Sequence, residues 1–147
     1  MGTSGWAYPT WKPGFYPDGL AAKKFLPFYA SQVNSVEVNY TFRALPTAKM
    51  LTDWLAATPE CFRFSFKAPQ RITHFKRLRE CEADLEQFAT ALDPVRDAGK
   101  LGLLLFQLPP NFKADADWKK LSKDDEYKET VSNITNLLLR PATGSQI

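Results

Sequence analysis

The chain has 147 residues, of which 44% are hydrophobic and 24% are charged, a balance typical of a folded globular domain and unlike a disordered one. Its length suits one domain and is short for a complete α/β barrel, and no apolar run approaches the ~20 residues that span a bilayer. The net charge of +3 is too small to indicate a nucleic-acid-binding protein by itself.

Strand and helix patterns alternate along the chain. Apolar and polar residues alternate with the period of a strand in two segments, and apolar residues recur at helical spacing in three others. In chain order the spacing predicts a helix over 20–32, a strand over 35–42, a helix over 47–57, a strand over 62–68, a helix over 82–93 and a strand over 101–108. This alternation indicates βα units around a mostly parallel sheet, so the predicted fold class is α/β.

Three of these segments carry more specific signals. Pro27 fits the first turn of the first helix, and Thr47 is a suitable N-cap for the second. The strand over 101–108 is almost continuously apolar, so we expect it to be buried on both faces.

The polar faces of two strands are the strongest signal for a site. If their apolar residues face the helices, the polar residues of both strands point inward together: Glu37, Asn39, Thr41, Arg63, Ser65 and Lys67. Charges buried inside a barrel must pair with one another or with a ligand, because an unpaired charge is costly. Active sites of parallel α/β proteins lie at the carboxyl ends of the strands, so we expect the site there.

The two cysteines and the first residues indicate a cytoplasmic protein. Cys61 and Cys81 lack the spacing of a metal site or a redox motif, which is typical of reduced thiols in the cytosol. Residues 1–6 contain no basic segment followed by an apolar stretch, so we expect no signal peptide.

Several motifs resemble one protein family in their order and spacing. They are Gly2–Pro9, Glu37–Asn39, Phe62–Pro69, Ile72–His74 and Leu104–Phe112. Together they resemble the YecE-like proteins, also called domain of unknown function 72, over roughly residues 2–113. The resemblance implies a TIM-barrel-like fold with a site at the strand ends, in a family whose activity is uncharacterised.

The chain departs from that family in two ways. A TIM barrel needs about 200–250 residues, and residues 114–147 show no family motif. We therefore expect a truncated protein, with the N-terminal half of a YecE-like barrel over 2–113 and a non-matching tail over 114–147. Arg43 also stands where the family tends to have a tyrosine, so a site tyrosine is expected to be missing.

Glu37, Lys67 and His74 are the candidate catalytic residues. Glu37 lies near the end of its strand, where Asn39 could assist it; the alternative is a structural ion pair with Lys67 or Arg63. His74 is the single histidine and could transfer protons, bind substrate or serve a structural role. We predict no metal site, because no other ligands stand at suitable spacing.

The remaining candidates would bind a substrate. They are Trp6, Tyr8, Asn39, Phe42, Arg71, Thr73 and Gln107. Aromatic rings could stack on a sugar or base, and an arginine suits an oxyanion. The alternatives are core packing for the aromatic residues, hydrogen bonds to the barrel backbone for Gln107, and a solvated loop for the basic residues after the strand over 62–68.

Three functions follow from these residues. The preferred one is an enzyme-like barrel acting on a small polar or anionic molecule, with its cofactor unknown. The second is a nucleic-acid-binding module that uses the basic segment 67–79 and the aromatic residues. The third is a fragment without a function of its own, whose open sheet edges favour self-association. No membrane partner is expected.

Overall fold

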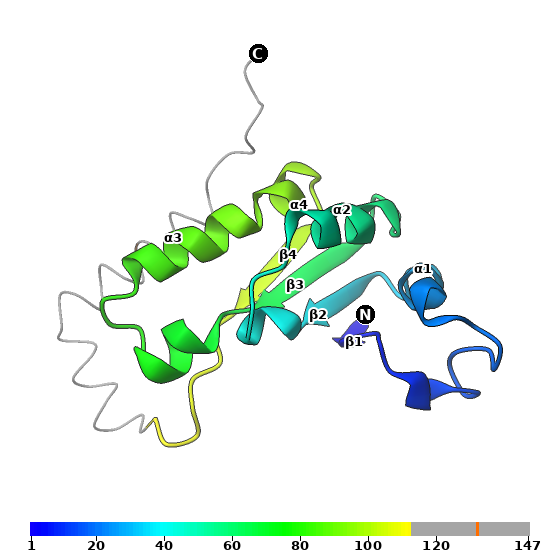
Figure 1. Cartoon of the computed structure of the whole chain (residues 1–147), viewed down its shortest axis with the longest axis horizontal. Coiled ribbons are helices and arrows are strands. Elements are labelled where there is room, and N and C mark those ends of the chain that lie inside the picture. The colour runs from blue at the N-terminus through cyan, green and yellow to red at the C-terminus, as the bar shows by residue number, and fades with distance from the viewer. Residues whose placement is uncertain (113–131, 133–147) are drawn as a thin grey trace, which may run out of the picture.

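A four-stranded parallel sheet is the framework of the computed structural model, which describes residues 1–112 and Ser132. The strands are β1 (Gly2–Ser4), β2 (Ser35–Val38), β3 (Arg63–Lys67) and β4 (Leu101–Leu105). They lie in the order β1-β2-β3-β4, and each neighbouring pair is parallel. Segments containing helices connect successive strands, as parallel pairing requires (Figure 1). The predicted α/β class is therefore confirmed.

The helices cover one face of this sheet (Figure 1). They are α1 (Phe25–Gln32), α2 (Ala48–Ala56), α3 (Glu82–Ala91) and α4 (Asp93–Asp97). Short helical turns complete the connections: η1 (Pro9–Trp11), η2 (Ala22–Lys24), η3 (Tyr40–Phe42) and the π-helical η4 (Arg71–Phe75). Buried side chains from α1, α2, α3 and α4 join those of β2 and β3 in one hydrophobic core.

Successive side chains of a strand point to opposite faces of the sheet, and this alternation determines which of them enter the core. Val36, Val38, Phe64 and Phe66 are at most 2% exposed and face the helices. Burying each of these side chains contributes roughly 1.5–3 kcal/mol. The intervening residues, among them Glu37, lie on the opposite face and are only half-buried. We call this opposite side the open face, because none of the described helices packs on it.

Helix α2 is held at both ends. Thr47 is its N-cap, with the Oγ1 atom accepting a hydrogen bond from the Met50 amide at 3.2 Å, as predicted. At the other end the buried Lys100 donates from Nζ to the carbonyl oxygens of Leu55 at 2.8 Å and Thr58 at 2.7 Å. A cation at the C-terminal end of a helix is favoured by the helix dipole and by the carbonyl oxygens that gather there. Pro27 lies in the first turn of α1, also as predicted.

The end of β2 was predicted wrongly. The strand stops at Val38, because Asn39 adopts helical dihedral angles and the η3 turn follows. Thr41 therefore does not point into the site. Its side chain is buried, and its hydroxyl lies 2.7 Å from the Lys67 carbonyl oxygen and 3.1 Å from that of Val38.

The expectation that the last strand is buried on both faces was also wrong. Leu103 is 73% exposed and Leu105 is 39% exposed. The reason is that β4 is an edge strand, and its open face contacts no described helix. The other predicted elements are present with shorter bounds, and β1, α4 and the short helical turns η1, η2, η3 and η4 were not among the predicted elements. The expected boundary at residue 113 and the tail over 114–147 lie outside the described residues.

Candidate functional site

The candidate site lies where the four parallel strands end. Their last residues are Ser4, Val38, Lys67 and Leu105. Because the strands are parallel, these ends share one edge of the sheet, which is where open α/β sheets bind ligands. The structure brings most of the predicted site residues to this edge, from the strand ends themselves or from the segments that follow them.

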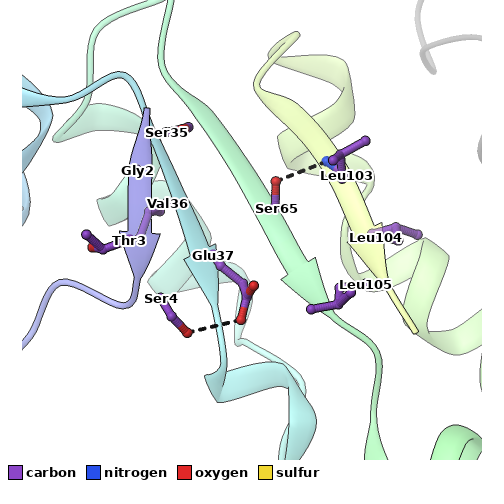
Figure 2. A pocket seen from close by; sticks show the side chains of 10 residues that line it. All are labelled: Gly2, Thr3, Ser4, Ser35, Val36, Glu37, Ser65, Leu103, Leu104 and Leu105. Atoms are coloured by element: carbon purple, nitrogen blue, oxygen red, sulfur yellow. Dashed lines mark hydrogen bonds between the residues drawn. The ribbon is translucent and has the colours of Figure 1, made fainter. Parts of the chain in front are cut away.

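A hydrogen-bonded acidic group links β1 and β2. Ser4 and Glu37 are paired in register, and Ser4 Oγ donates to Glu37 Oε1 at 3.0 Å (Figure 2). Asn39 Nδ2 donates to the same Ser4 oxygen at 2.5 Å. The network fixes the Glu37 carboxylate on the open face. Ser4 was missed in the sequence, although extending the polar alternation of β2 to its neighbour would have found it.

The basic side chains of β3 do not neutralise this carboxylate. Lys67 Nζ lies over the ring of Phe42, 4.7 Å from its centroid. The Arg63 guanidinium donates to the carbonyl oxygens of Glu60 and Phe62, at 2.9 and 3.1 Å. A structural ion pair of Glu37 with Lys67 or Arg63, the alternative role of this carboxylate, is thus not formed among the residues that the structure describes.

A second group of side chains joins β3 to η4 through an aromatic ring. Phe42 stands between two titratable residues, with Lys67 over its face and the His74 ring edge-on at 5.0 Å. Thr73 is buried, and its hydroxyl lies 2.9 Å from His74 Nδ1 and 3.3 Å from the Pro69 carbonyl oxygen. If the hydroxyl donates to Pro69, His74 Nδ1 carries a proton and Nε2 remains as an acceptor.

Two hollows adjoin the acidic group. The first, of about 300 Å³, is at the ends of β1 and β2 and is lined by Trp6, Tyr8 and Asn39, three of the predicted binding residues. Trp6 is fixed there by edge-to-face packing on Trp54, with the ring centroids 5.2 Å apart. The second, of about 400 Å³, lies on the open face, where Figure 2 shows Glu37 among its lining residues.

Two predicted residues stand apart from these groups. Gln107 is exposed in the segment after β4. Arg71 Nε contacts Asp84 Oδ1 at 2.6 Å, and Lys76 Nζ contacts Asp84 Oδ2 at 2.8 Å. Burial alone would raise the pKa of Asp84, but the hydrogen bonds from Lys76 and Arg71 outweigh it and leave the pKa below its ordinary value. Two cations of the basic segment 67–79 therefore already have a carboxylate partner.

Neither a metal centre nor a membrane span is found in the described part of the chain. Within it, no three His, Cys, Asp or Glu side chains are close enough to hold a metal ion. None of its helices has the length and apolar character needed to cross a membrane.

Similar proteins identify the family. A family model described as "Protein of unknown function DUF72" matches residues 1–132. The UPF0759 protein YecE of Escherichia coli strain K12 is 34% identical over 112 residues, covering 76% of this chain and 38% of YecE. The UPF0759 protein YunF of Bacillus subtilis strain 168 is 33% identical over 116 residues, covering 76% of this chain and 40% of YunF.

Solved structures show the same architecture. A DUF72 family protein from Thermotoga maritima MSB8 superposes with a TM-score of 0.72 at 29% identity, over 89% of this chain and 51% of that protein. One from Enterococcus faecalis V583 gives a TM-score of 0.63 at 20% identity, over 92% of this chain and 44% of that protein, and supports the fold alone. The chain thus spans well under two thirds of the length of the relatives that it matches.

Proposed function

The chain belongs to the DUF72 family of proteins of unknown function, and from this premise we propose that it binds a small polar or anionic molecule at the carboxyl ends of its strands, as half of an enzyme-like TIM barrel. The one-sided parallel sheet and the likeness to a protein of about twice the matched length support the half-barrel.

One observation carries the binding proposal. Glu37 and Lys67 lie at the ends of neighbouring strands with opposite charges, yet each contacts a neutral group. Both side chains are half-buried, so each charge has lost part of its hydration without gaining a counter-ion among the described residues. A ligand that offers an anion to Lys67 and a hydroxyl group to Glu37 would supply both missing partners.

The roles of the individual groups follow from their chemistry. The Lys67 ammonium would hold the anion, and Phe42 keeps that ammonium in place through the cation–π contact. The Glu37 carboxylate would accept a proton from the ligand, while Ser4 and Asn39 orient it. His74 would act as the second proton-transfer group, and Trp6 would form an aromatic wall.

Titration of the isotope-labelled protein, followed by nuclear magnetic resonance, tests this proposal. The probes are inorganic phosphate, which offers an anion without an alcohol group, and glycerol 3-phosphate, which adds two alcohol hydroxyl groups. We expect saturable shifts around Lys67 and His74 with both probes, and tighter binding of glycerol 3-phosphate. Lys67→Met should weaken the binding of both probes about tenfold or more, because a charge-assisted hydrogen bond contributes roughly 1.5–3 kcal/mol to the binding free energy. Glu37→Gln should weaken the binding of glycerol 3-phosphate and leave the binding of inorganic phosphate unchanged.

Lys49→Met is the matched control for these variants. Lys49 lies on the exposed side of α2 and pairs with Asp53 in a solvent-exposed ion pair, so its loss should leave both titrations unchanged. Equal weakening by Lys49→Met and Lys67→Met would mean unspecific charge attraction and would overturn the proposal. Shifts that never saturate with either probe would overturn it as well.

A further inference from the structure

The described sheet has two edges, and neither contains the charged residues or prolines that often keep edge strands apart, although β1 is short. β1 consists of Gly2, Thr3 and Ser4, and β4 of leucines and one glycine, so neither strand contains a proline or a charged residue. Natural edge strands are usually blocked by charges, prolines or a covering element, because their unpaired main-chain groups otherwise attract another strand.

Apolar surface accompanies both edges. On β4, Leu103 and Leu105 project from the open face with 73% and 39% of their surface exposed. Beside β1 lies a hollow of about 440 Å³ whose lining includes Trp11, Phe15 and Tyr29. Exposed apolar groups beside strand edges that no other described strand pairs with favour contact with another polypeptide.

The two edges are complementary to each other. All strands run parallel and follow the order β1-β2-β3-β4, so a strand added beside β4 in the same direction continues the sheet, and the β1 strand of a second copy can take that place. A twofold axis along the strands then places the other β4 beside the other β1. Eight parallel strands is also the number at which a βα sheet closes into a barrel, and closure leaves no edge.

We propose that two copies of this chain associate edge to edge, with β4 of one copy paired in parallel with β1 of the other, so that two half-barrels close one eight-stranded ring. The inference rests on the half-barrel of the proposed function, and the 51% coverage of the Thermotoga relative agrees with two such halves. The pairing would place the Ser4–Glu37 end of one copy beside the Gln107 end of the other. Each candidate site would then be completed by the second copy.

The molar mass in solution tests the association. Light scattering behind a sizing column should give twice the 16.7 kDa of one chain. Leu103→Lys should give a monomer that keeps its far- and near-ultraviolet circular dichroism, because Leu103 contributes little to the core of one copy. Ala83→Lys, on the exposed side of α3, is the control and should remain a dimer. A well-folded monomeric wild type, or a Leu103→Lys variant as dimeric as Ala83→Lys, would overturn the proposal.

Cysteine cross-linking tests the edge-to-edge arrangement. In a Cys61→Ser background, Ser4→Cys and Leu105→Cys are made as two separate proteins, since both positions are at strand ends on opposite edges. A short bis-maleimide should link the mixture of the two proteins and should link neither protein alone. Links within either single variant would indicate two sheets packed face to face and would contradict the ring.

The two proposals can fail separately, because the mass is measured without ligand. A monomer that still binds glycerol 3-phosphate would support the proposed function and contradict the eight-stranded ring. A dimer that binds neither phosphate probe would support the ring and contradict the proposed function.

Discussion

At the scale of single residues, the two cysteines differ in their surroundings and should differ in reactivity. Cys61 is exposed and Cys81 is fully buried. Burial, reinforced by the charge of Glu82, raises the pKa of Cys81 from 9.0 to about 11. In a thiol-reagent assay at mildly alkaline pH we expect one fast thiol, which Cys61→Ser removes, and a second that reacts only on unfolding. Two fast thiols in the native protein would contradict this assignment.

Tyr16 should make the protein sensitive to alkali. Its ring is fully buried, its hydroxyl donates to the Trp6 carbonyl oxygen at 2.5 Å, and burial, followed by the influence of Tyr29, raises its pKa from 10.0 to about 12. The unfolded chain releases the phenolic proton of Tyr16 at a lower pH than the folded chain does. The contribution of Tyr16 to the free energy of unfolding is therefore fully present below pH 10 and is lost as the pH rises towards 12. The loss is on the order of 2 kcal/mol. Denaturant unfolding at several pH values should show it, and the Tyr16→Phe variant should not lose stability in this window to the same extent.

At the scale of elements, Asp84 fastens the η4 turn to the start of α3. Its carboxylate holds both Arg71 and Lys76, and its lowered pKa means that its stabilising effect is present above the ordinary carboxyl range and is lost as the pH falls through the lowered value. Asp84→Asn should reduce the free energy of unfolding at neutral pH by about 1–2 kcal/mol and remove part of the acid sensitivity. Asp53→Asn, which breaks only an exposed ion pair, should cost far less. Equal losses in the free energy of unfolding in the two variants would show that the Asp84 contacts contribute no more than an exposed ion pair.

The elements that could be predicted are those whose signal is local. The alternation of Val36 and Val38 and the Thr47 cap depend only on neighbouring residues, and both were predicted correctly. The early end of β2 could not be predicted. The η3 turn that ends the strand is joined to a segment far away in the sequence, because the Thr41 hydroxyl donates to the Lys67 carbonyl oxygen of the next strand. The exposure of Leu103 likewise depends on what covers β4, which strand periodicity does not encode.

At the scale of the whole molecule, the gathering of the candidate residues at one edge of the sheet was predictable, and the contacts among them were not. The parallel topology alone brings Glu37, Asn39 and Lys67 to one edge. Which of them touch depends on register and on side-chain rotamers. Ser4, absent from the predicted site, turned out to hold the carboxylate, and Arg71 turned towards Asp84.

The buried Lys100 has a consequence for how such a protein can change over generations. It lies at the amino end of β4 and ties that end to the last turn of α2, whereas the candidate ligand groups gather at the carboxyl ends. Lys100 thus stabilises the rim of the sheet opposite the one at which we propose that a ligand binds. In random mutagenesis, we therefore expect most substitutions of Tyr8 and Gln107 to leave the protein folded and most substitutions of Lys100 to unfold it. Residues at the carboxyl rim could then change and bind new ligands while the molecule stays folded.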